Sequence, residues 1–198
     1  MPITPLTDLD QRGWMVQPQL TWDQKLPDGP DAVQLIPGVV GPEWMRAEGP
    51  FRTLPQSAGE AGGADLDVQV ALEARFDRDR GCYLLRSLTV EAPDGSEVTG
   101  VLLREIAPLR IMRWVLPRTF QVEQDKLSVW VSAFIAPEVA AQATDPRPEA
   151  ALEDAATVYR LAEVVREPPA KAVADALGLQ TRTATNWIVR ARKQGLLE

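Results

Sequence analysis

The chain has 198 residues, 45% of them hydrophobic, which suits one large domain or one domain with a small appendage. Its 28 acidic and 21 basic residues give a net charge of -7, which argues against a protein that coats nucleic acid regardless of sequence. Because the chain has no histidine and one cysteine, it excludes histidine catalysis, histidine-containing zinc sites and an intrachain disulfide. We expect no catalytic residue, no cofactor and no metal site.

The chain begins without a basic run followed by an apolar stretch. A secretory signal has that pattern, and a membrane span needs a long apolar run. We therefore expect a cytoplasmic protein that does not associate with membranes.

Prolines and glycines divide the first 150 residues into short pieces, which is typical of strands and turns. Short strands are predicted at 13–23 and at 32–40, each bounded by proline or glycine. The run of small residues between them and the next strand, at 56–65, predicts a loop.

Alternation of apolar and polar residues over 67–76 predicts a half-buried strand. Turn residues follow at 77–81, and 83–90 then reads as a second strand, so the two form a hairpin. One face of the second strand is predicted to hold Cys82, Leu84, Leu88 and Val90. Tyr83 and Arg86 read as ordinary strand surface.

Thr99 can cap a short helix after this hairpin, and Pro108 ends that helix or starts the next one. A last strand is predicted at 127–135. The inward-facing residues of the short helix are predicted to be Leu102, Leu103 and Ile106.

Beyond Pro148 the apolar residues recur three and four apart, which predicts an amphipathic helix of about seventeen residues. The predicted fold class is α+β: a strand-rich, mixed N-terminal domain with short helices, and a C-terminal all-α trihelical helix-turn-helix unit. The expected boundaries are 1–146 for the acidic α+β domain and 147–198 for the trihelical unit.

The C-terminal segment follows the pattern of a helix-turn-helix. A short helix at 171–177 contains the small Ala174, which lets a second helix cross closely. Gly178 supplies the positive φ that a sharp turn requires, and Leu179 fills the gap between the helices. On the second helix, the residues expected to face inward are Ala184, Trp187 and Ile188.

The outward residues of this segment have the chemistry that DNA requires. From Pro169 to the end there are five basic and two acidic residues, a net charge of +3. Side chains that can bond base edges in a major groove are predicted at Gln180, Thr181, Arg182, Thr185 and Asn186. Contacts to phosphates are predicted for Lys171, Arg190 and Lys193.

Residues 169–197 resemble the helix-turn-helix of uncharacterised actinobacterial proteins and of mobile-element or phage proteins. Gln180 departs from that pattern, because a serine usually caps the second helix there, and the helix is therefore expected to begin at Thr181. Residues 68–114 resemble, more weakly, a domain that accompanies such units. The resemblance implies double-stranded DNA as the partner. The matching residues are Ala172, Val173, Ala174, Ala176, Gly178, Thr183, Ala184, Trp187, Arg190, Ala191, Arg192, Gly195, Leu196 and Leu197.

The N-terminal region contains five of the six tryptophans, which favours a well-filled core over an aromatic recess. Its acidic turn residues Asp77, Asp79 and Asp94 are explained by backbone preference, and not by a cation site. We expect this domain to bind protein, self-associate or sense a ligand. The five tryptophans are Trp14, Trp22, Trp44, Trp114 and Trp130.

The sequence thus predicts a non-enzymatic regulator of transcription, or a mobile-element or phage control protein, that binds specific DNA as two copies. The alternative is an adaptor whose trihelical unit binds protein. An enzyme is the third option, and it would need a pocket of paired carboxylates in the N-terminal domain.

Overall fold

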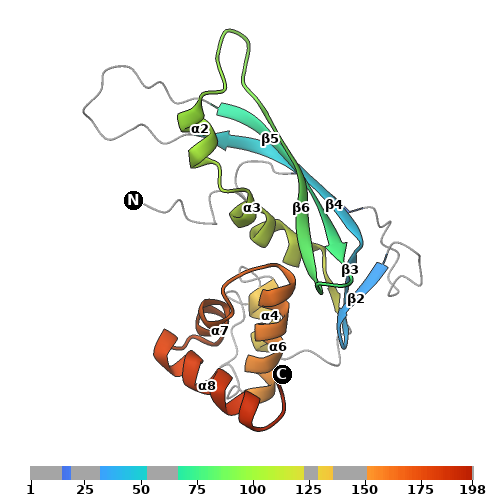
Figure 1. Cartoon of the computed structure of the whole chain (residues 1–198), viewed down its shortest axis with the longest axis vertical. Helices are drawn as coiled ribbons and strands as arrows, with labels where there is room; N and C mark the ends of the chain where they lie inside the picture. Colours follow the sequence, from blue (N-terminus) through green and yellow to red (C-terminus); the bar gives the residue numbers. More distant parts are fainter. Residues whose placement is uncertain (1–14, 19–31, 53–66, 123–128, 136–150, 198) are drawn as a thin grey trace.

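The computed structural model describes residues 15–18, 32–52, 67–122, 129–135 and 151–197. These residues form a mixed α+β fold with two antiparallel sheets, which confirms the predicted class in its coarse form. Figure 1 shows the long sheet beside α2 and α3, with α4, α6, α7 and α8 gathered at one end of the molecule. The predicted loop at 56–65, Trp14 and Trp22 lie outside the described residues.

The larger sheet has the strand order β1-β4-β5-β6. The last two strands in this order, β5 and β6, are the predicted hairpin, in which Phe76 pairs with Tyr83. The turn between them is closed by Asp77, whose Oδ1 accepts hydrogen bonds from the N–H groups of Asp79 (3.1 Å) and Arg80 (3.0 Å). The strands are β1 (Met15–Pro18), β4 (Trp44–Arg52), β5 (Asp67–Asp77) and β6 (Cys82–Glu91).

A β-bulge in β6 makes the predicted face of this strand wrong. Leu85 pairs with Ala74 and Ser87 pairs with Glu73, so Arg86 is the extra residue. An extra residue reverses the alternation of side chains along the strand. The core face therefore holds Tyr83, Leu85, Leu88 and Val90, whereas Cys82 and Leu84 lie on the opposite face.

Tyr83 is a core residue and not strand surface. Its side chain is 0% exposed, and its hydroxyl donates a 2.6 Å hydrogen bond to the carbonyl of Pro42. Burial raises the pKa of this hydroxyl, so it remains a neutral donor. Gly41 makes room for it, because a Cβ there would lie 2.6 Å from the Tyr83 oxygen.

Pro42 belongs to the second sheet, whose order is β2-β3-β7. The single strand predicted at 32–40 is in fact the start of a hairpin, because Pro37 and Gly38 form a turn inside it. The strands of this second sheet are β2 (Ala32–Ile36), β3 (Val39–Pro42) and β7 (Gln121–Val122).

Two helices follow β6. Thr99 caps α2 (Gly100–Glu105) by accepting the Leu102 N–H at 3.2 Å, and Pro108 is the first residue of α3 (Pro108–Val115), both as predicted. Leu102 and Ile106 are buried, but Leu103 is 48% exposed, which corrects its predicted inward orientation. The short 3-10 helix η1 (Leu116–Thr119) extends α3, and α3 packs against β5 and β6.

The strand predicted at 127–135 is wrong: the segment contains the helix α4 (Val129–Ile135). Its sequence, VWVSAFI, is apolar almost throughout, so its periodicity does not separate strand from helix. Packing decides, because α4 contacts α6 and α7 and buries Val131 and Ile135, which lie one helical turn apart.

Three further helices complete the described chain: α6 (Leu152–Val164), α7 (Pro169–Leu177) and α8 (Thr181–Lys193). Each packs against the other two. The helix α6 has 13 residues, fewer than the predicted seventeen. The buried residues form one cluster that runs from the sheets through α4 into these helices. Within the described ranges, no helix has the length and apolar character of a membrane span.

Candidate nucleic-acid interface

A tight turn joins α7 to α8. Gly178 has φ of +65°, and the N–H groups of Gly178 and Leu179 both bond to the carbonyl of Ala174. Leu179 is half-buried and packs against the core, as predicted. This turn sets the direction in which α8 leaves α7.

One face of α8 holds it against the other helices. Ala184 and Ile188 are buried as predicted, with Ala191 continuing the same face, and Trp187 is half-buried. The small Ala174 on α7 is also buried. Because these residues fix the rotation of α8, the remaining residues of the helix face outward.

Every residue predicted to read bases is exposed. Thr181 is the first residue of α8, and Gln180 precedes it without making a side-chain capping bond. Thr185 donates its hydroxyl to the carbonyl of Thr181 at 2.9 Å, which leaves the hydroxyl oxygen free to accept. The other exposed members of this set are Arg182 and Asn186.

One exposed residue on this face, Val189, was not among the residues predicted from the sequence. Its side chain is 44% exposed, and its position on α8 places it one turn after Thr185 and Asn186 and one turn before Lys193. The periodicity that predicted the polar residues also places Val189 on their face, and this signal was available in the sequence.

The three predicted phosphate contacts differ in their surroundings. Lys171 is exposed but forms an ion pair with Asp175, one turn later on α7. Arg190 and Lys193 are exposed in the last turn of α8. Since exposed ion pairs contribute little stability, Lys171 can exchange its partner at small cost.

Two other basic residues have structural roles. Arg192 donates to the Tyr159 hydroxyl at 2.8 Å, and its guanidinium carbon lies 5.4 Å from the centre of that ring. Arg160 donates to the carbonyl of Leu196 at 2.5 Å. Burial raises the pKa of Tyr159, and the neighbouring Glu163 raises it further. Both effects favour the neutral hydroxyl. These contacts fasten α6 to the end of α8.

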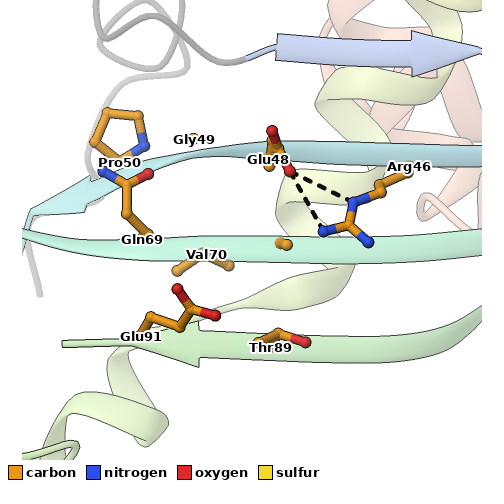
Figure 2. Close-up of a pocket in the computed structure, with 9 residues that line it drawn as sticks. Arg46, Glu48, Gly49, Pro50, Gln69, Val70, Thr89 and Glu91 are labelled. Carbon is orange, nitrogen blue, oxygen red and sulfur yellow. Dashed lines mark hydrogen bonds and ion pairs between the residues drawn. The ribbon is translucent and has the colours of Figure 1, made fainter.

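A second candidate site is a hollow of about 400 Å³ on the sheet. Figure 2 shows the residues that line it on β4, β5 and β6, with Glu91 and Thr89 on one side and Arg46 at one end. Arg46 is paired with Glu48 (3.4 Å) and Glu73 (3.3 Å), so its charge is already balanced. The part of the chain described here contains no group of three or more acidic or cysteine side chains placed to hold a metal ion.

No protein-family model, curated protein or solved structure matches this chain. The geometry and charge of α7 and α8 are therefore the features of this chain that bear on its function.

Proposed function

We propose that this protein binds specific sequences of double-stranded DNA through α8 and regulates transcription or a mobile element in the cytoplasm. The observation that carries the proposal is the outer face of α8. This face is exposed and, apart from Val189, polar, and α8 contains no acidic residue over its 13 positions.

The side chains on this face match the major groove, which is wide enough to admit a helix. Arg182 can donate two hydrogen bonds to guanine, and Gln180 and Asn186 can bond adenine in the same bidentate way. Arg190 and Lys193 carry the charge that phosphates attract.

The charge distribution supports the same orientation. Residues 169–198 carry +3 of a total of -7, which leaves -10 for residues 1–168. The acidic remainder is repelled by the phosphate backbone, so α8 is the part of the molecule that turns toward DNA. We expect two copies of the chain to bind adjacent half-sites, because one helix-turn-helix buries limited surface.

The test separates base reading from phosphate contact. A preferred duplex is first selected from random DNA, and binding is then measured for that duplex and for an unrelated one. Arg182→Ala should weaken the selected duplex by about 1–3 kcal/mol and leave the unrelated one nearly unchanged. Lys193→Ala should weaken both alike and reduce the salt slope by about 1. Equal losses on both duplexes for Arg182→Ala would refute the assignment.

The competing proposal is an adaptor that uses the same helices to bind protein. Titrations of duplex binding at two salt concentrations distinguish the two. A DNA-binding protein loses affinity steeply as salt rises, because phosphate contacts release counterions. An adaptor shows no specific duplex binding at either concentration.

A further inference from the structure

We infer that Val189 recognises the C5 methyl group of a thymine in the major groove. This inference rests on the proposed function and deepens it, since it names one chemical feature of the preferred DNA. The observation behind it is an apolar side chain in the middle of an otherwise polar face.

The position of Val189 follows from helix geometry. Residues three and four apart lie on the same side of a helix, so Arg182, Thr185, Asn186, Val189 and Lys193 form one stripe along α8. All five are exposed. Arg190 lies beside this stripe in the last turn. A groove that receives Asn186, with Lys193 against a phosphate one turn beyond Val189, therefore also receives Val189.

Folding gives no reason for a valine at this position. Among the described residues, the large hydrophobic side chains with marked exposure are Val189 at 44%, Val101 at 43% and Leu103 at 48%. Val189 lies outside the core cluster and its packed neighbours, so it adds little to the core. A β-branched residue is also a poorer helix former than the lysine, arginine or glutamine typical of an exposed helix position.

The major groove supplies a partner for such a side chain. Thymine is the base that presents an apolar group there, the C5 methyl, and apolar side chains contact it. Asn186, one turn before Val189, can bond the N6 and N7 atoms of adenine. The pair Asn186 and Val189 thus fits a preferred site that contains A·T base pairs.

The experiment uses the full chain and its selected duplex. Each thymine is replaced in turn by uracil, which lacks the C5 methyl and keeps the same pairing. We expect one replacement to weaken binding about 4-fold, the effect of losing one buried methyl-sized group. Val189→Ala, which keeps one methyl-sized group, should lose most of the preference for thymine over uracil. The matched control is Val101→Ala on α2, which should keep the full preference for thymine.

Unfolding does not confuse this test, because alanine is a better helix former than valine at an exposed position. Thermal melts of both variants check this. Wild-type protein that binds the selected duplex but tolerates uracil at every thymine would overturn the inference and leave the proposed function intact. The same holds if Val189→Ala keeps the full thymine preference of the wild-type protein. Wild-type protein that shows no sequence preference would overturn both proposals.

Discussion

At the scale of single residues, Glu167 lies in the turn between α6 and α7, where charges from α3 and α7 act on its carboxyl. Its carboxyl is partly buried, and this burial raises its pKa above the usual 4.5. The nearby charges of Lys171 and Arg113 oppose the effect, and Asp175 adds to it. Since Arg113 belongs to α3, an N-terminal helix takes part in the electrostatics of the α6–α7 turn.

The raised pKa of Glu167 predicts how the stability of the protein depends on pH. A carboxyl whose pKa is raised by folding holds its proton more tightly in the folded state. The free energy of unfolding therefore falls as pH rises from about 4.5 through the folded pKa. Glu167→Gln removes this loss, so it should raise the melting temperature at pH 7 and have little effect below pH 4.5.

Thermal melts at pH 4 and pH 7 measure the difference. The exposed Glu97→Gln serves as the control and should shift neither melt. A lower melting temperature for Glu167→Gln at pH 7 would contradict this expectation and show that attraction by Lys171 and Arg113 outweighs the burial of Glu167.

Much of the candidate interface was predictable from single residues. Helical periodicity and the position of Gly178 placed the polar residues of α8 on the outside, where they lie. The ion pair of Lys171 with Asp175 follows from their spacing but was not predicted. The roles of Arg160 and Arg192 were not predictable, because their partners lie 36 and 33 residues away in the sequence, respectively.

At the scale of elements, the ends of α6 and α7 show two solutions to one problem. Both helices are followed by a residue in the left-handed region, Arg166 with φ of 60° and Gly178 with φ of 65°. An L-residue with a side chain is strained there by roughly 1–2 kcal/mol, whereas glycine is not. One helix thus ends at low conformational cost and the other does not.

We therefore expect Arg166→Gly to stabilise the protein by about 1 kcal/mol and Gly178→Ala to destabilise it by about 1–2 kcal/mol. A Cβ at Gly178 would have nothing within 4 Å, so strain and not collision sets the cost. Gly100→Ala is the matched control, because Gly100 has equally open surroundings without a positive φ. Urea denaturation measures all three, and a stable Gly178→Ala would contradict the prediction.

The elements that were predicted correctly have strong local signals. The hairpin of β5 and β6 combines a long alternating strand with turn residues, and α2 has its capping threonine. The helix α4 and the bulge at Arg86 were missed because their causes are not local. Contacts with α6 and α7 decide the first, and pairing with β5 decides the second.

At the scale of the whole molecule, packing links the residues on the two sides of the predicted domain boundary. The sequence predicted a boundary between 146 and 147, within a segment that lies outside the described residues. Elements from the two sides of that boundary are in contact: α4, before it, packs against α6 and α7, after it. The helix α6 also contacts β2 and β6. One cluster of buried residues therefore spans both predicted domains.

A shared core predicts that the chain unfolds in one step, because neither part can lose its partner without exposing apolar surface. Tryptophan fluorescence follows mainly the region before residue 147, which holds five of the six tryptophans, and far-ultraviolet circular dichroism follows the helices. The two signals should change at the same temperature. Ile135→Ala, in α4, should lower both transitions together and reduce stability by about 2–5 kcal/mol.

Two independent domains would give a different result. Fluorescence and circular dichroism would then report separate transitions, and Ile135→Ala would shift only one of them. Val101→Ala is the control, because its exposed side chain on α2 should leave both transitions in place. A single transition that Ile135→Ala lowers as a whole would mean that α8 is held by the same core as the sheet, so that a change in either sheet can alter how α8 is presented.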